Sequence, residues 1–324
     1  MVAAVRVHKP GGSEVLTLEE VDVPAPGPGQ IRVKQGACGI NFIDVYFRSG
    51  LYAAPSLPFI PGNDGAGTVT AVGADVKDIK VGDRVGYVVT LGSYAAERLL
   101  PADRAVKLPE QISDQQAAGM MLKGMTVQYL LHRTFKVQKG MNVLIHAAAG
   151  GVGSIFCQWA SHIGANVIGT VGSPEKAEIA KSNGCHHTIL YRDEDFVARV
   201  KEITGGALCD VVYDSIGKAT FPQSLDCIRP IGTFVSFGSA SGPISAFDIS
   251  LLQTKGSLFA TRPTLVTYIA KRDDLLKTAN ALFEVVIGGQ VKIPVNQKYP
   301  LKDAQQAHRD LESRKTTGSS ILIP

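Results

Sequence analysis

The chain has 324 residues, which is long for a single hydrophobic core and sufficient for two domains. Hydrophobic residues make up 45% and charged residues 19% of the chain, a composition that excludes an intrinsically disordered protein and favours a globular enzyme. The formal net charge of +4, with both signs interspersed, is too small to indicate a nucleic-acid-binding protein.

The cysteine pattern and the apolar runs indicate the cellular compartment. The five cysteines are scattered, and no two of them form a Cys-x-x-Cys pair. They therefore predict neither a disulfide framework nor a thiolate zinc cluster, and they favour a reducing compartment. No N-terminal segment has the apolar core of a signal peptide, and no apolar run reaches the roughly 18 residues of a membrane span. We expect a cytoplasmic protein without a membrane partner.

Short extended stretches separated by glycine and proline fill the first part of the chain. They include "VRVHKPGG", "VDVPAPGPGQIRVKQGA", "GAGTVTAVGADV" and "VGDRVGYVV". This rhythm predicts an antiparallel β domain of the barrel or sandwich type, without a long amphipathic helix, up to residue 123.

Beyond residue 123 the pattern changes to strand, turn and helix. Strands are expected at 142–147, 166–171, 210–216, 233–238 and 256–263, with helices at 154–164, 174–184 and 219–228. This alternation predicts an α/β region with a parallel sheet covered by helices on both faces. Two helical patterns, at 273–289 and 301–314, then precede a strand-like 319–324. The predicted division is therefore 1–123 with 264–324 for one domain and 124–263 for the other.

The stretch "HAAAGGVG", residues 146–153, joins the first strand and the first helix of the second region. It meets the dinucleotide-binding pattern as Ala148, Gly150 and Gly153, and Ala148 is tolerated there if its φ stays negative. Gly151 adds a backbone N–H at the helix N-terminus, where anions are favoured. The position between a strand and a helix predicts nucleotide binding. His146 is expected to be a hydrogen-bonded core residue, and no Ser–His–Asp or paired-carboxylate arrangement is evident.

The end of the next strand, "VGSPEK", predicts which nucleotide is bound. No acidic residue stands at the strand tip, where an NAD-binding protein has a carboxylate for the ribose hydroxyls. Ser173 can donate a hydrogen bond to a 2′-phosphate, Lys176 can neutralise it, and Tyr191 can reach the same place. Glu175 is expected to point away. The sequence therefore predicts NADPH rather than NADH.

Motifs along nearly the whole chain resemble those of one known family. They are "GINFIDVYFRSGLY" (39–52), "PGNDGAGTV" (61–69), "VGDRV" (81–85), "LKGMTVQYLL" (122–131), "HAAAGGVG" (146–153), "YDSIG" (213–217) and "KGSLFATRP" (255–263). In these the chain resembles the zinc-free quinone oxidoreductase, or zeta-crystallin-like, branch of the medium-chain dehydrogenase/reductase superfamily. The resemblance implies a GroES-like catalytic domain with an inserted Rossmann domain, an active site in the cleft between them, and a homodimer formed through Rossmann strands.

The chain departs from the zinc-containing relatives at their metal ligands. Asn41 stands where they have a catalytic-zinc cysteine, and Asn63–Asp64 replaces a His–Glu pair. Asparagine is a poor ligand for Zn²⁺, and Cys38 is a lone thiol. Asp44 is either an oxygen ligand or a local hydrogen-bond partner, and we expect the second. The sequence thus predicts no metal.

Without a Lewis acid, hydride transfer to acceptors that are already electrophilic is favoured over alcohol oxidation. The predicted function is NADPH-dependent reduction of small quinones or similar electrophiles. The alternatives are an alkenal or enone double-bond reductase of the same fold and, from another class, a non-catalytic RNA-binding or structural protein. Tyr46 and Tyr52 are candidates for the acceptor pocket; alternatively, they only pack with satisfied hydroxyls.

The resemblance also implies cofactor contacts in both domains. Those near the nicotinamide and its ribose are Asn41, Lys123 and Thr126. Those near the pyrophosphate are the backbones of Gly150, Gly151 and Val152. Those around the adenosine 2′-phosphate are Gly172, Ser173, Lys176, Tyr191 and Arg314. Further implied contacts are Phe237, Gly238 and Ser239, which follow a core strand, together with Phe259 and Arg262.

Overall fold

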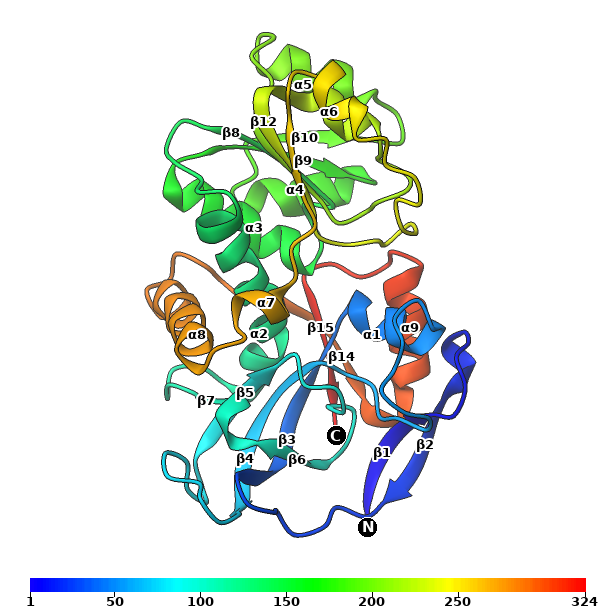
Figure 1. Ribbon diagram of the computed structural model, residues 1–324, viewed down its shortest axis with the longest axis vertical. Coiled ribbons are helices and arrows are strands. Elements are labelled where there is room, and N and C mark those ends of the chain that lie inside the picture. The colour runs from blue at the N-terminus through cyan, green and yellow to red at the C-terminus, as the bar shows by residue number, and fades with distance from the viewer. The chain divides into compact units, whose positions relative to one another are not determined.

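The computed structural model describes residues 1–324, which divide into two compact units (Figure 1). The first comprises Met1–Met125, Ile269–Ile287 and Ile293–Pro324, and the second comprises Thr126–Tyr268 and Gly288–Lys292. None of the helices combines the length and the apolarity that crossing a bilayer requires.

The first unit is built on a seven-stranded sheet in the order β14-β15-β3-β4-β5-β7, with β6 paired to β3, and on a separate β1–β2 pair. Every pair is antiparallel except β14–β15. The strands are β1 (Val2–Val7), β2 (Leu16–Val21), β3 (Gln30–Ile40), β4 (Asp64–Val72), β5 (Arg84–Val88), β6 (Glu97–Pro101), β7 (Ala105–Lys107), β14 (Val295–Pro300) and β15 (Ser319–Ile323). The helices are α1 (Phe42–Ser49), α2 (Asp114–Tyr129), which continues into the second unit, α8 (Arg272–Ile287) and α9 (Ala304–Glu312).

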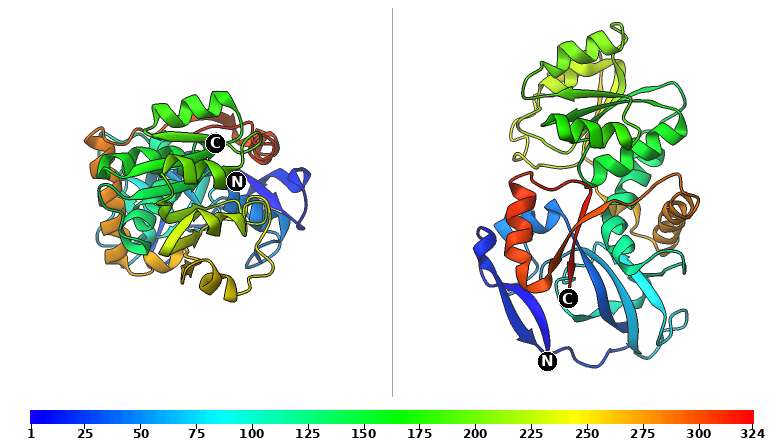
Figure 2. Two further views of the ribbon diagram at one scale, coloured as in Figure 1. Left: turned by 90° about the horizontal axis from the view of Figure 1, so that it is seen from above. Right: turned by 180° about the vertical axis from the view of Figure 1, so that it is seen from behind.

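Two helices of this region were not expected from the sequence. Helix α1 begins directly after β3 and ends at Gly50, whose φ of 83° suits a residue without a Cβ. Helix α2 is buried on nearly all sides, so its apolar residues do not follow the one-sided period that identifies an amphipathic helix. Helices α1 and α9 lie side by side in Figure 1 and again, seen from behind, in Figure 2.

The second unit contains a six-stranded parallel sheet in the order β10-β9-β8-β11-β12-β13. The strands are β8 (Asn142–His146), β9 (Asn166–Val171), β10 (His187–Leu190), β11 (Cys209–Asp214), β12 (Ile228–Ser236) and β13 (Phe259–Thr261). The helices are α3 (Gly151–Ile163), α4 (Pro174–Ser182), α5 (Phe196–Ile203), α6 (Ser250–Thr254) and α7 (Leu265–Tyr268). Helices α3 and α4 pack together on one face, while α5 and α6 cover the other. The sheet is doubly wound, as predicted, and the strand order reverses between β8 and β11.

Two expected elements are shorter than predicted. The helix expected at 219–228 is a single 3₁₀ turn, Gln223–Cys227, because Pro222 within the stretch has no N–H to donate and cannot continue an α-helix. The strand expected at 256–263 is only β13, and Gly256 before it has a φ of 111°, outside the extended region.

Candidate functional site

The glycine-rich turn between β8 and α3 leaves backbone donors at the helix N-terminus. The chain reverses at Ala147, whose φ is 58°, while Ala148 has no positive φ, as the sequence predicted. Gly150 is the N-cap of α3, and no side chain caps the helix there. The first N–H groups of a helix have no partner within the helix, so an anion such as a pyrophosphate fits this position.

Glycine is favoured at two positions of this turn for two different physical reasons. A Cβ on Gly153 would lie 2.3 Å from the carbonyl oxygen of Ala147, so only glycine lets α3 pack this closely. A Cβ on Gly150 would have one neighbour, the same oxygen at 3.2 Å, and would otherwise enter open space. The turn therefore presents an uncovered backbone surface at Gly150 that fits a phosphate group.

The end of β9 gathers four of the residues predicted for the 2′-phosphate. A Cβ on Gly172 would lie 3.0 Å from the hydroxyl of Tyr191. Ser173 is the N-cap of α4 and accepts a hydrogen bond from the backbone N–H of Lys176 at 3.4 Å. A hydrogen bond from the Ser173 side chain also lowers the pKa of Glu175, so the expectation that Glu175 points away from this position is wrong.

The residues predicted after β12 form a second group in this unit. Arg262 donates to the carbonyl oxygen of Ser236 at 2.9 Å and to the hydroxyl of Ser239 at 3.5 Å. The segment 237–239, with Gly238 at its centre, directly follows β12, so Arg262 and this segment lie together. Phe259, on edge strand β13, is 61% exposed.

In the first unit, two asparagines and two aspartates form buried pairs. Asn41 Nδ2 donates to Asp64 Oδ1 at 2.7 Å, and Asn63 Nδ2 donates to Asp44 Oδ1 at 2.8 Å. The backbone N–H of Asn41 donates to Asp44 Oδ2 at 2.8 Å. Asp44 is thus a hydrogen-bond partner, as expected. No group of three or more His, Cys, Asp or Glu side chains is arranged to hold a metal ion.

The electrostatics of this cluster are dominated by burial. Burial raises the pKa of Asp44 to about 7 and also raises the pKa of Asp64, which the charge of Lys123 partly opposes. Burial lowers the pKa of Lys123, whose Nζ donates to the carbonyl oxygen of Ile40 at 3.2 Å. Asn41 Oδ1 is buried without a hydrogen-bond partner. It therefore offers an acceptor to a donor group such as a carboxamide N–H.

The two predicted pocket tyrosines are in mutual contact. The ring centroids of Tyr46 and Tyr52 are 5.2 Å apart in an edge-on arrangement, and the backbone N–H of Tyr52 donates to the carbonyl oxygen of Tyr46 at 3.0 Å. Tyr46 is buried and Tyr52 is half-buried. Helix α1 thus carries Tyr46 five residues after Asn41, and the turn that follows returns Tyr52 to it.

The remaining predicted contacts lie on α2 and just after α9. Lys123 and Thr126 are both buried on α2, the first in the first unit and the second in the second unit. Arg314 belongs to the first unit, where it is exposed just after α9 and has a φ of 59°.

A buried chain of polar side chains behind Asp44 was missed from the sequence. The hydroxyl of Tyr94 donates to Asp44 Oδ2 at 3.1 Å and lies 3.1 Å from His308 Nε2. Arg48 lies 3.1 Å from His308 Nδ1 and makes two hydrogen bonds of 2.8 Å to the Glu312 carboxylate. Tyr94 and His308 are 214 positions apart, and no motif in the sequence joins them.

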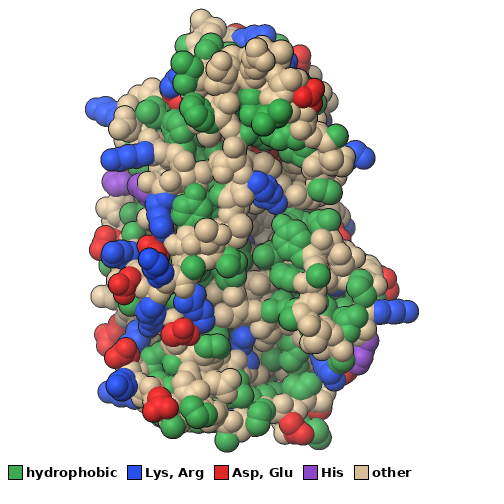
Figure 3. Space-filling model, in the orientation of Figure 1, with side chains coloured by type: hydrophobic (Ala, Val, Ile, Leu, Met, Phe, Trp, Pro, Cys, Tyr) green, Lys and Arg blue, Asp and Glu red, His purple; other side chains and the backbone are tan.

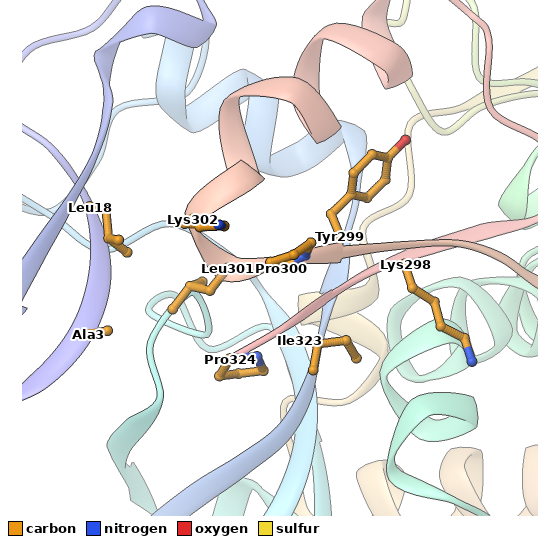
Figure 4. Close-up of a pocket in the computed structure, with 9 residues that line it drawn as sticks. All are labelled: Ala3, Leu18, Lys298, Tyr299, Pro300, Leu301, Lys302, Ile323 and Pro324. Carbon is orange, nitrogen blue, oxygen red and sulfur yellow. The ribbon is translucent and has the colours of Figure 1, made fainter.

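An apolar groove of about 480 Å³ in the first unit contains none of the predicted site residues (Figure 4). It is lined by Ala3, Leu18, Lys298, Tyr299, Pro300, Leu301, Lys302, Ile323 and Pro324. Its lining has no cluster of polar side chains like that around Asn41, so the groove is not the candidate site.

Comparison with known proteins identifies the family of the chain. Residues 27–110 match the alcohol dehydrogenase GroES-like domain, and residues 151–281 match the zinc-binding dehydrogenase family. The chain is 51% identical to a quinone oxidoreductase of Salmonella typhimurium, over 100% of both chains. The crystal structure of Escherichia coli quinone oxidoreductase complexed with NADPH superposes with a TM-score of 0.98 and 50% identity, covering 99% of this chain and 100% of that one.

A relative with a different activity is also similar over the full length. A 2-haloacrylate reductase of Burkholderia sp is 47% identical over 100% of this chain and 99% of its own. The predicted fold class, a GroES-like β-rich domain with a Rossmann doubly wound domain, is confirmed. These similarities show that the chain belongs to the quinone oxidoreductase family of the medium-chain dehydrogenase/reductase superfamily.

Proposed function

We propose that this protein is an NADPH-dependent quinone oxidoreductase that reduces small quinones without a metal ion. The observation that carries the proposal is the pairing of Asn41 with Asp64 and of Asn63 with Asp44. Amide groups replace the thiolate and imidazole that Zn²⁺ prefers, and both carboxylates are already engaged. An acceptor in this site must therefore be electrophilic without a Lewis acid, as a quinone is.

The residues present fit NADPH. When bound, NADPH supplies a hydride. The uncapped N-terminus of α3 holds the pyrophosphate, and Ser173, Lys176 and Tyr191 hold the 2′-phosphate. The free Oδ1 of Asn41 accepts from the nicotinamide carboxamide. Lys123 and Thr126, both on α2, support the nicotinamide side.

The acceptor is held by the tyrosine pair. The hydroxyls of Tyr46 and Tyr52 donate hydrogen bonds to a quinone oxygen, and their rings limit the access of water to the reacting carbon. Quinone, NADPH and one proton give hydroquinone and NADP⁺, and the proton that completes the hydroquinone comes from water.

The protein acts as a homodimer in a reducing compartment. Strand β13 is an edge strand whose three residues are all exposed, and such an edge is open to pairing with a second copy. All five cysteines are unpaired and buried, which suits the cytoplasm.

A second candidate function is reduction of a conjugated double bond. It is favoured by the full-length similarity to the 2-haloacrylate reductase, because both reactions add hydride to an electrophilic carbon. An RNA-binding role has no comparable support. On the face drawn in Figure 3, basic and acidic side chains intermingle and no large area is basic alone.

An acceptor screen separates the two candidates. Purified protein is assayed for loss of NADPH absorbance with benzoquinone, a naphthoquinone, 2-chloroacrylate and cyclohexenone, each with and without EDTA. We expect turnover with both quinones at rates that EDTA does not change. If the quinones fail while the acrylate or the enone is reduced, the double-bond reductase replaces the proposal.

Tyrosine variants provide the internal control for this screen. Tyr46→Phe and Tyr52→Phe should raise the KM for benzoquinone several-fold, by about 1 kcal/mol for each lost hydrogen bond, and leave the Kd for NADPH unchanged. An unchanged KM for the quinone in both variants removes the tyrosines from the acceptor site.

A further inference from the structure

Four polar side chains form a continuous buried hydrogen-bond network in the second unit. They come from the end of β8 (His146), from β9 (Thr170), from the end of β11 (Asp214) and from the Gln223–Cys227 turn (Ser224). Each of them is 2% exposed or less. His146 Nδ1 lies 2.9 Å from the Thr170 hydroxyl, His146 Nε2 lies 3.0 Å from the Ser224 hydroxyl, and the Ser224 hydroxyl donates to Asp214 Oδ2 at 2.9 Å.

The carboxylate of Asp214 determines which group donates and which accepts in each hydrogen bond of this network. A carboxylate only accepts, so the Ser224 hydroxyl gives its proton to Asp214 rather than to the weaker acceptor at 3.0 Å, the carbonyl oxygen of Thr220. Ser224 Oγ then accepts from His146 Nε2–H, which leaves His146 Nδ1 to accept from the Thr170 hydroxyl. Burial lowers the pKa of His146, which keeps the ring neutral in this tautomer.

The Ser, His and Asp residues do not form a hydrolytic triad, although the sequence had given no sign that they meet. In a triad the serine donates to the histidine, and here the serine donates to the aspartate. Ser224 is fully buried, so no substrate can reach its hydroxyl. The hydrogen bonds of this chain therefore hold backbone in place.

Thr170 connects this hydrogen-bond network to the glycine-rich turn. Its carbonyl oxygen accepts from the backbone N–H of Ala148 at 3.1 Å, two residues before Gly150. Its own strand, β9, ends at the next residue and leads directly to Gly172 and Ser173. One residue thus fixes both the pyrophosphate turn and the start of the 2′-phosphate site.

Asp214 connects the chain to the ends of β11 and β12. Its Oδ1 accepts from the backbone N–H groups of Ile216 at 2.7 Å and Gly217 at 2.9 Å. Its carbonyl oxygen accepts from the backbone N–H of Phe237 at 2.8 Å. Phe237 begins the segment 237–239, which the family resemblance implies contacts the cofactor, so the backbone of Asp214 holds this part of the sheet edge as well.

We propose that the chain Thr170–His146–Ser224–Asp214 is a positioning network that fixes the carboxyl ends of β8, β9 and β11 and thereby sets the affinity for the dinucleotide. The inference rests on the proposed function, because it assumes that NADPH binds at this edge. Loss of one link leaves buried polar groups unpaired and loosens every strand end that they hold. Binding of both NADPH and NADH is weakened, because the network holds the turn for the pyrophosphate that the two coenzymes share.

Three variants test the network, and a fourth is the matched control. Thr170→Val keeps the shape and removes the hydroxyl, Thr170→Ser keeps the hydroxyl, and Ser224→Ala removes the central link. Ser319→Ala removes another fully buried serine hydroxyl, which donates to the carbonyl oxygen of Gly119 at 2.7 Å in the first unit. The Kd for NADPH and for NADH is measured by fluorescence titration, and the Tm by calorimetry.

The expected pattern separates positioning from general stability. Thr170→Val and Ser224→Ala raise the Kd for both coenzymes about tenfold, equivalent to about 1.4 kcal/mol. Thr170→Ser and Ser319→Ala change either Kd by less than about twofold, although Ser319→Ala lowers the Tm as Ser224→Ala does. Hydrogen exchange of the coenzyme-free protein should show faster exchange at the amides of Ala148, Ile216 and Gly217 in the two disruptive variants.

The results that overturn the inference are distinct from those that overturn the proposed function. If the wild-type chain binds NADPH and Thr170→Val and Ser224→Ala bind it equally well, the network only stabilises the fold. A Kd raised as much by Ser319→Ala has the same meaning. If the wild-type chain binds no NADPH, the proposed function fails and this inference fails with it.

Discussion

In the proposed function, the choice between NADPH and NADH depends on a few side chains at the end of β9. Ser173 caps α4 and contacts both Lys176 and Glu175, and Tyr191 lies against Gly172. A lysine and two hydroxyl groups suit a 2′-phosphate, while the nearby Glu175 carboxylate opposes it.

Lys176→Ala should therefore weaken NADPH selectively. The KM for NADPH should rise about tenfold, for about 1.4 kcal/mol of lost charge-assisted hydrogen bonding, while the KM for NADH stays within about twofold. Lys181→Ala, on the same helix but paired with Glu178, is the control and should change neither. Equal effects of Lys176→Ala on both coenzymes would show that Lys176 does not touch the phosphate.

The buried carboxyl of Asp44 makes stability depend on pH. Its pKa is about 7 in the folded protein and near 3.8 when unfolded, so the folded state binds more protons between these values. Its contribution to stability is therefore present below about pH 4 and is lost as the pH rises through about 7.

Asp44→Asn isolates this contribution. The unfolding free energy of the wild type minus that of the variant should fall as the pH rises from about 4 to about 7, by at most about 1.4 kcal/mol per pH unit. Urea unfolding of both proteins across this range measures the difference. A difference that stays constant with pH would show that Asp44 is ionised throughout.

At this scale the sequence predicts the residues that belong to short motifs. Gly150, Ser173 and Lys176 follow known strand ends, and the structure places them at one sheet edge. The contacts of Tyr94 with His308, and of His146 with Ser224, join residues 214 and 78 positions apart. Such pairs have no signal in a single sequence, because only the tertiary fold brings them together.

In the β8–α3 turn, one glycine is required by close packing and another leaves open space for a ligand. Gly153 faces backbone at a distance that no Cβ tolerates, whereas Gly150 faces open space.

Alanine at Gly153 should mainly lower the stability, whereas alanine at Gly150 should mainly weaken the binding of NADPH. Gly153→Ala should lower the unfolding free energy by about 1–3 kcal/mol, because the methyl must displace the turn. Gly150→Ala should cost less than about 1 kcal/mol of stability but raise the Kd for NADPH about tenfold, because its methyl enters the space for the pyrophosphate. Urea unfolding and coenzyme titration of both variants check this. A Gly150→Ala variant that binds NADPH normally would place the pyrophosphate elsewhere.

The elements that the sequence predicted correctly are those with a clear period or clear ends. Strand β9 has the expected bounds, Asn166–Val171, and α4 begins at Pro174. Helix α2 was missed because burial on nearly all sides removes the period of its apolar residues. The helix expected at 219–228 was wrong because Pro222 interrupts it.

The exposed edge strand β13 of the second unit is the surface through which we propose that two copies of the protein pair. Besides Phe259, Ile231 is 64% exposed, and its backbone N–H donates to the carbonyl oxygen of Gly256 just before β13, so both side chains offer apolar surface to a second copy.

Phe259→Asp should therefore convert a dimer into a monomer. A charge on the pairing edge costs several kcal/mol of association, because two copies would bring two carboxylates together. Light scattering coupled to gel filtration measures the mass of both proteins. A wild-type chain that is monomeric, or a variant that remains dimeric, would contradict an interface at β13.

In the proposed function, the protein transfers hydride from NADPH to a quinone without a metal ion. The most direct test is kcat/KM for NADPH and for NADH with benzoquinone as acceptor, measured on protein dialysed against a chelator and on the same protein with Zn²⁺ restored. We expect a kcat/KM at least about tenfold higher for NADPH than for NADH and no dependence on Zn²⁺. A rate that is lost with the chelator and returns with Zn²⁺, or an equal preference for NADH, would contradict it.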